Sequence, residues 1–288
     1  MITIFSIPRP FKGIFDAIQK NAIKSWMSLR PKCQIILFED EEGTTKKVAE
    51  EFGLDYVSDA ERNEFGSLLL DSVFNAVLKK AKNGILAEIT ADIILEKDFI
   101  EAVRKVKKEL GEKHFYMSGR RWNVEIEGEI DFQDERWEEK INETIRTKGK
   151  LHRLSSMDYR VFPRDFNFDP LPLTTGRPGD DSWLIYRAKS KGVPVIDATP
   201  IVKAIHLNHG QPFKKQNFFM VETERNIKIA GGYVNMMTLR DADWILTAEG
   251  LKRPPFPRRI FSTLSMFYPW RLMLSTKRKL HSIFYGYK

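Results

Sequence analysis

Three groups of polar side chains in this sequence have the residue types that metal binding and proton transfer require. Asp92 ends an apolar run, Asp180 and Asp181 are adjacent, and His206 and His209 enclose a Leu-Asn pair. Carboxylates, with an occasional imidazole, can hold Mn²⁺ or Mg²⁺ while diphosphate oxygens and water fill the remaining positions. A buried carboxylate with a raised pKa can instead remove a proton from a hydroxyl group. These residues therefore predict a divalent metal site and a general base.

The two histidines are not expected to act alike. They lie three residues apart in a segment without helical pattern, so their side chains need not point the same way. We expect one of them to be a metal ligand and the other a hydrogen-bond donor, with Asp92 as the carboxylate ligand. Capping of the following helix accounts for one of Asp180 and Asp181, which leaves the second free to act as the base.

Each of these groups also has a purely structural interpretation. Asp92 could close a turn or cap the next helix. His206 lies between the apolar residues Ile205 and Leu207 and could be a satisfied core histidine.

The elements around these residues are those of an α/β protein. Apolar runs alternate with amphipathic segments, which predicts a mostly parallel sheet with right-handed crossovers. Ligands bind outside the carboxyl ends of the strands in such sheets, and Asp92 lies at that end of its strand. Strands are predicted at 2–6, 34–38, 54–57, 84–92, 114–118, 157–162 and 193–197, and helices at 16–29, 45–52, 68–81, 98–110 and 180–191. Residues 131–150 are mostly charged, which predicts a solvated helix or a mobile insertion.

Composition restricts the class of protein. With 288 residues, 42% hydrophobic and 30% charged, the chain can bury a full core. Its one cysteine, Cys33, excludes an intrachain disulfide and a multi-cysteine zinc site. The first residues lack the pattern of a signal peptide and no apolar run reaches about 18 residues, so we expect a cytoplasmic protein.

The net charge of +8 belongs to the C-terminal segment. Residues 251–288 contain nine Lys or Arg, eight aromatic residues and no Asp or Glu. We therefore expect a main domain over 1–250 and a basic, aromatic tail over 251–288, which suits an amphipathic helix lying on an anionic membrane. A helix that packs back on the domain, and a surface for single-stranded nucleic acid, are the alternatives; we do not expect nucleic acid as a partner.

Five blocks of sequence, in chain order, resemble GT-A type nucleotide-sugar glycosyltransferases of a family-2-like group. The resemblance spans roughly residues 1–248. The blocks are Ile4–Phe11 (IFSIPRPF), Asn63–Ser72 (NEFGSLLLDS), the strand that leads to Asp92, Gly176–Trp183 (GRPGDDSW) and His206–His209 (HLNH).

This resemblance implies a GT-A, Rossmann-like fold and the transfer of a sugar from a nucleoside-diphosphate donor to a hydroxyl acceptor. We expect that acceptor to be a glycan or lipid-linked and the transfer to proceed with inversion. It implies that Asp181, beside Asp180, is the base and that Asp92, with His206 and His209, binds Mn²⁺ or Mg²⁺. The donor site that it implies consists of Ser6, Pro8, Arg9 and Asp40 around the nucleoside, with Asp71; Trp183 is the residue expected to cover the site and to stack on a sugar ring.

One departure keeps other functions open. The first acidic position of the Asp-x-Asp metal motif is Thr90 here, which favours a non-catalytic nucleotide-sugar binder or a membrane adaptor on the same scaffold. A sugar nucleotidyltransferase is a further alternative, although no glycine-rich phosphate loop with a lysine follows the first strand.

Overall fold

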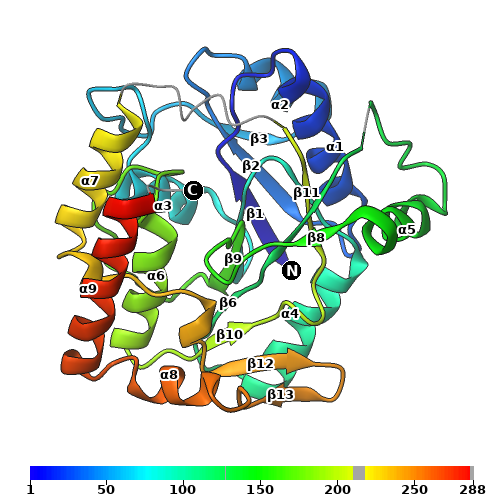
Figure 1. Cartoon of the computed structure of the whole chain (residues 1–288). Helices are drawn as coiled ribbons and strands as arrows, with labels where there is room; N and C mark the ends of the chain where they lie inside the picture. Colours follow the sequence, from blue (N-terminus) through cyan, green and yellow to red (C-terminus); the bar gives the residue numbers. More distant parts are fainter. Residues whose placement is uncertain (127, 210–217, 286–288) are drawn as a thin grey trace.

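The computed structural model describes residues 1–126, 128–209 and 218–285. Its centre is a sheet with the strand order β13-β12-β10-β6-β9-β4-β1-β2-β3, flanked by helices on both faces (Figure 1). Only β9 and β13 run antiparallel to their neighbours, so the prediction of a mostly parallel α/β sheet is confirmed. The strands are β1 (Ile2–Ser6), β2 (Gln34–Phe38), β3 (Asp55–Val57), β4 (Ile85–Ile89), β6 (Tyr116–Ser118), β9 (Tyr159–Pro163), β10 (Val195–Asp197), β12 (Trp244–Thr247) and β13 (Gly250–Lys252).

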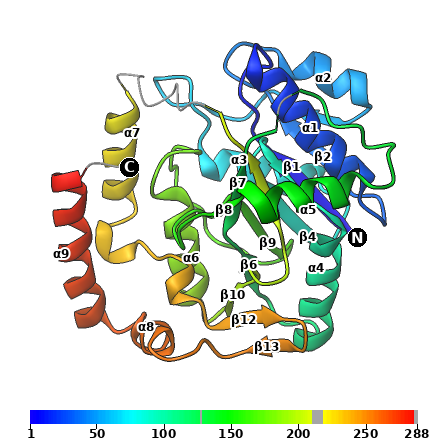
Figure 2. The same cartoon turned by 45° about the vertical axis from the view of Figure 1, so that its right-hand side comes forward.

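Two layers of helices cover this sheet because each helix has one apolar stripe. In α1 (Ile14–Ser28) the stripe is Ile18, Ala22 and Trp26, all buried at helical spacing. Figures 1 and 2 show α1, α2 (Thr45–Phe52) and α4 (Lys97–Leu110) on one side, and α3 (Leu70–Lys80), α6 (Asp180–Ser190) and α7 (Phe219–Ile229) on the other. The result is a three-layer α/β/α arrangement.

A second, small sheet was not predicted from the sequence. Its strand order is β5-β11-β7-β8, with bounds β5 (Ile93–Ile94), β7 (Arg121–Val124), β8 (Lys150–Leu151) and β11 (Ala204–Leu207). Two of these strands have only two residues, too few for a period of two to be recognised.

The strand prediction for residues 84–92 was too long. β4 ends at Ile89, and the chain turns at Thr90, whose backbone N–H and hydroxyl both donate to the carbonyl of Asp158, at 2.9 and 3.1 Å. β5 then starts directly after Asp92. Asp92 therefore lies in the connection between the two sheets, three residues beyond the end of β4.

The charged segment 131–150 contains a docked helix and not only a solvated one. In α5 (Trp137–Lys148) the buried residues are Trp137, Ile141 and Ile145, again at helical spacing. They pack with Ile94 of β5 and Ile205 of β11. The charged positions between them concealed this narrow apolar stripe.

The C-terminal segment folds against the domain. Leu251 and Lys252 belong to β13, so the main sheet continues two residues past position 250. Two helices follow, α8 (Arg258–Leu264) and α9 (Tyr268–Tyr285), and Arg271 of α9 donates to Asn235 Oδ1 at 3.1 Å in the short 3₁₀ helix η2 (Tyr233–Asn235). Over the described residues, none of the helices combines the length and the apolar character needed to cross a membrane.

Candidate active site

Asp92 and His206 meet because two strands pair across the small sheet. β11 runs antiparallel to β5, with His206 opposite Ile93, the neighbour of Asp92. Side chains alternate along a strand, so His206 faces away from Ile205 and Leu207, which pack beside α5. The apolar neighbours of His206 suggested a core histidine, but its imidazole lies on the opposite face of β11 from theirs.

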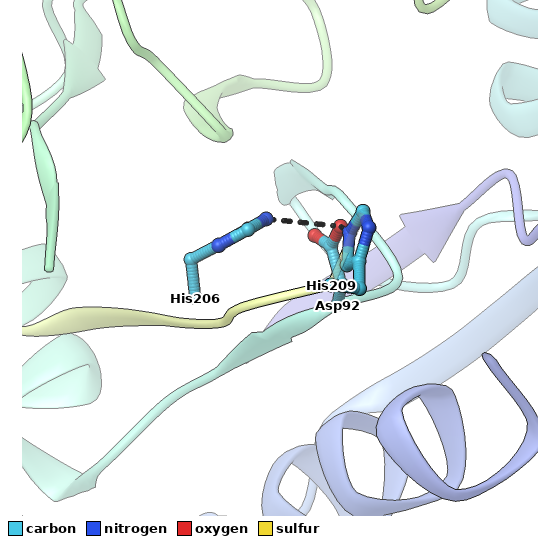
Figure 3. A group of neighbouring side chains, drawn as sticks. All are labelled: Asp92, His206 and His209. Atoms are coloured by element: carbon cyan, nitrogen blue, oxygen red, sulfur yellow. Dashed lines mark hydrogen bonds and ion pairs between the residues drawn. The ribbon is translucent and has the colours of Figure 1, made fainter. Parts of the chain in front are cut away.

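His209 completes the cluster from beyond the end of β11. Its Nε2 lies 2.9 Å from Asp92 Oδ2, and His206 Nε2 lies 3.4 Å from the same oxygen. Figure 3 shows the two imidazoles on either side of the carboxylate. The sequence left open whether both histidines would point the same way, and in the structure both reach Asp92. Their role as metal ligands stays a prediction.

The electrostatics of the cluster favour an ionised Asp92. Burial by itself raises the pKa of this carboxyl, since only 7% of the residue is exposed, but the contacts with His206 and His209 outweigh burial and hold the pKa well below its ordinary range. Asp92 Oδ1 and His206 Nδ1 are buried and have no hydrogen-bond partner among the described residues. The carboxylate therefore keeps capacity for another ligand.

The donor set fits a divalent cation. Two ligands at right angles around an ion with bonds of about 2.1 Å lie about 3.0 Å apart, close to the two separations found here. One ligand atom from each residue lies within 4.8 Å of the others. Two imidazoles suit Mn²⁺ better than Mg²⁺, which prefers oxygen ligands. Without an ion the same geometry is a carboxylate that accepts hydrogen bonds from two histidines.

Arg9 lies on the β1 side of this cluster. Its guanidinium lies 5.0 Å from the ring centre of Phe15, and the ring centres of Phe15 and His209 are 4.8 Å apart in a T-shaped contact. Burial lowers the pKa of Arg9, nearby Asp92 raises it, and Arg177 lowers it. Arg9 thus lies within electrostatic reach of both Asp92 and the Gly176–Trp183 block.

Asp180 and Asp181 begin α6 and differ in their surroundings. Asp180 is held on both oxygens, by the backbone N–H of Gly176 at 3.0 Å and of Asp181 at 2.6 Å, and pairs with Arg160 at 3.7 Å. Asp181 accepts one hydrogen bond, from the N–H of Ser182 at 2.6 Å. Burial, followed by the charge of Asp180, raises the pKa of Asp181 to about 7. Of the pair, Asp181 has the properties of a proton acceptor near neutral pH.

Beneath this helix start lies a buried polar group that the sequence interpretation missed. Arg160 of β9 lies between Glu88 of β4, at 3.4 Å, and Asp180, and all three are more than nine-tenths buried. Burial lowers and the two carboxylates raise the pKa of Arg160, with a net rise. Two sequence features could have predicted this group: a glutamate inside the run Ile-Leu-Ala-Glu-Ile and an arginine inside Tyr-Arg-Val-Phe. A charge buried in such a strand needs a partner of opposite charge.

Arg177 was part of a quoted motif but had no assigned role. Its Nε lies 2.6 Å from Oε2 of Glu222, a fully buried residue of α7. Oε1 of Glu222 accepts from the amide of Asn63 at 2.7 Å. This ion pair joins the Gly176–Trp183 block, the Asn63–Ser72 block and α7. Three segments far apart in the sequence are thereby held at one place.

The remaining predicted donor-site residues have mostly structural partners. Ser6 donates to the carbonyl of Ile89 at 2.5 Å, and Pro8 is buried. The Asp40 carboxylate accepts five hydrogen bonds within its own turn, from the backbone of Glu42 and from the backbone and hydroxyl groups of Thr44 and Thr45. Their contact with a nucleoside stays a prediction.

Asp71 and Trp183 complete the predicted set. Asp71 lies in the first turn of α3 and accepts from the N–H of Ser72 at 2.9 Å, which is compatible with dipole compensation. Trp183 packs in the core between α3, α6 and the sheet with 4% of its surface exposed. Its indole has no face open to a sugar in this structure, so the geometry gives the stacking assignment no support.

Comparison with known proteins finds a likeness in fold among solved structures. No family model and no curated protein matches the chain. A mannosyltransferase from Pyrobaculum calidifontis, PcManGT, solved with GDP-Man and Mn²⁺, has a TM-score of 0.50 at 13% identity, over 100% of this chain and 76% of that one. TarS residues 1–349 from S. aureus, solved with UDP-GlcNAc, has a TM-score of 0.50 at 12% identity, over 99% and 76%. The chain therefore has the GT-A, Rossmann-like fold that its resemblance to nucleotide-sugar glycosyltransferases predicts.

Proposed function

We propose that this protein is a metal-assisted glycosyltransferase that moves a sugar from a nucleoside-diphosphate donor to a hydroxyl acceptor on a glycan or a lipid-linked carrier. The observation that carries the proposal is the meeting of Asp92 with His206 and His209 within a GT-A fold. Asp92 and the two histidines would hold Mn²⁺, which would stabilise the negative charge that develops on the leaving diphosphate.

The donor would lie across the carboxyl ends of β1 and β4. The positive charge of Arg9, within electrostatic reach of Asp92, supports binding of the diphosphate on this side. Ser6, Pro8 and Asp40 follow or end the neighbouring strands β1 and β2, where the nucleoside is expected to bind. Asp71 would add a further contact at the start of α3.

Asp181 would act as the general base. It would take the proton from the acceptor hydroxyl as that oxygen forms a bond to the anomeric carbon, while the bond from this carbon to the diphosphate oxygen breaks. Attack in line with the leaving group inverts the configuration at the anomeric carbon. Asp180 would hold the helix start, since its own oxygens are already occupied.

The test is a screen of nucleoside-diphosphate sugars with Mn²⁺, read as release of the nucleoside diphosphate and as transfer to added acceptors. We expect turnover with at least one donor, and a loss of about 100-fold or more in Asp181→Asn with donor binding retained, since a general base contributes about 10²–10⁴ in rate. Full turnover of this variant would remove Asp181 from the role. Release of pyrophosphate from a nucleoside triphosphate and a sugar phosphate would instead identify a nucleotidyltransferase.

Thr90 supports one second candidate. Its hydroxyl donates to the carbonyl of Asp158 and it brings no charge to the site, so only one carboxylate of the Asp-x-Asp motif is present. A non-catalytic nucleotide-sugar binder would keep donor affinity and show no turnover with any donor in the screen.

A further inference from the structure

A second site of recognisable chemistry lies at the edge of the sheet opposite β3. A cavity of about 520 Å³ opens there beside α8 and β12. Its lining includes the polar and charged side chains of Lys189, Asp243, Arg253, Arg259 and Ser262. Met266 adds an apolar side chain to the lining. None of these residues belongs to the candidate active site.

The cavity has an excess of positive charge. Lys189 forms an ion pair within the protein, since its Nζ lies 2.5 Å from Asp243 Oδ1. The same carboxylate also accepts from the N–H of Val195 at 2.9 Å. Arg253 and Arg259 are both exposed, and Arg253 lies 4.0 Å from the ring centre of Trp244. Two guanidinium groups at the cavity are therefore not balanced by a carboxylate of its lining, an arrangement that suits a phosphate.

The chain in and around α8, which lines the cavity, also has exposed apolar side chains. Arg259, Ser262, Thr263 and Met266 line the cavity at the spacing of one helical face. Ile260 lies in α8, while Phe256 precedes and Phe267 follows the helix; they are 39%, 80% and 59% exposed. Soluble domains seldom expose large apolar side chains together unless something covers them.

The start of α9 extends this apolar surface. Tyr268 and Met273 are more than half exposed and Leu272 is half exposed, whereas Arg271 and Leu274 of the same helix face the domain. Figures 1 and 2 both place α8 and the start of α9 at one corner of the molecule. α9 is thus held by one face and leaves its other face outward.

We propose that α8 and the start of α9 form a docking surface for an anionic membrane, in which Phe256, Ile260, Phe267 and Leu272 enter the interface and the cavity beside Arg253 and Arg259 receives a phospholipid headgroup phosphate. Charge complementarity selects this occupant: the tail from residue 251 has nine basic and no acidic residues. The surface is separate from the metal cluster, so it does not depend on the proposed transferase activity.

Vesicle flotation of the full chain tests this surface. The vesicles are phosphatidylcholine alone or with phosphatidylglycerol, and the variants are Arg253→Glu with Arg259→Glu, and Ile260→Ser with Phe267→Ser. Arg104→Glu with Lys108→Glu on the exposed face of α4 is the matched control, because it changes the net charge equally. We expect anionic vesicles to bind wild type and control alike, and both tail variants to bind at least about tenfold more weakly. Thermal unfolding and donor binding should be unchanged in all variants.

Three results would overturn the proposal. They are equal binding to neutral vesicles, an equal loss in the α4 control, and absence of binding to anionic vesicles. A dimer in sedimentation that only the tail variants dissociate, without flotation, would assign the surface to a second copy of the chain and would equally contradict membrane docking. Donor turnover in the same samples reports on the transferase proposal independently.

Discussion

Asp180 and Asp181 are adjacent residues of the same type, but their carboxylates have different surroundings. Asp180 is fixed by backbone N–H groups and by Arg160, while Asp181 has one hydrogen bond and a pKa raised to about 7 by burial. The sequence predicted that helix capping would occupy one member of the pair, but the N-cap is Gly179 and no side chain caps the helix. Asp180 is instead occupied as the first residue of α6, by the N–H groups of Gly176 and Asp181. The sequence could not show Arg160, because that partner comes from β9, twenty residues earlier.

The raised pKa of Asp181 predicts a particular dependence of stability on pH. An unfolded Asp loses its proton near about pH 3.9, so between about pH 4 and pH 7 the folded chain holds a proton that the unfolded chain has released. The free energy of unfolding should therefore fall as the pH rises through this window. Denaturant unfolding at several pH values should show a shallower fall in Asp181→Asn, which cannot ionise.

Asp98 offers the matched control for this prediction. Burial raises its pKa to about 7 as well, although its carboxylate accepts from the N–H of Lys203, outside the candidate site. Asp98→Asn should flatten the pH dependence of stability in the same direction. Transfer activity should rise through about pH 7 as Asp181 loses its proton, and this rise should be the same in Asp98→Asn as in wild type. If Asp181→Asn unfolds with the wild-type pH dependence, Asp181 is not buried as described.

At the scale of elements, α7 is tied to the start of α6 by an ion pair inside the protein. Arg177 and Glu222 form this pair with side chains 10% and 0% exposed. Removing one partner of a buried pair leaves the other charge uncompensated, at a cost of about 3–5 kcal/mol. Glu222→Gln should therefore lower the unfolding free energy by about that amount and weaken donor binding through displacement of the Gly176–Trp183 block.

Arg225 and Glu64 provide the comparison on the same helix. Their ion pair, at 2.8 Å, joins α7 to the same loop as Asn63, but the Glu64 side chain is 63% exposed and the Arg225 side chain 33%. Glu64→Gln should cost less than about 1 kcal/mol. A similar loss in both variants, measured by urea unfolding, would mean that α7 is not held by the buried pair.

The elements also explain which predictions from the sequence were accurate. β1 and β2 have the predicted bounds because each is a short, mostly apolar stretch that a clear turn signal ends. β4 and β5 read as one strand because Ala91 and Ile93 continue the apolar pattern through the turn. The turn depends on Asp158, a contact that no local pattern encodes. The same limit applies to Trp183, whose motif position said nothing about its place in the core.

At the scale of the whole molecule, the site is a product of the two sheets. The main sheet places Arg9 and the end of β4, while the small sheet brings His206 and His209 to Asp92 across more than a hundred residues of sequence. The class of fold followed from the alternation of strands and helices along the chain. The small sheet did not, since the pairing of β5 with β11 is set by tertiary packing under α5.

Binding of Mn²⁺ measured by electron paramagnetic resonance tests whether Asp92, His206 and His209 form a metal centre. With a nucleoside diphosphate present, wild-type protein should remove one equivalent of Mn²⁺ from the free signal, and Asp92→Asn and His209→Gln should each lower the affinity by at least about tenfold, with Asp98→Asn as the unaffected control. Equal Mn²⁺ binding by wild type and the two site variants, or none by any of them, would contradict a metal centre at Asp92, His206 and His209.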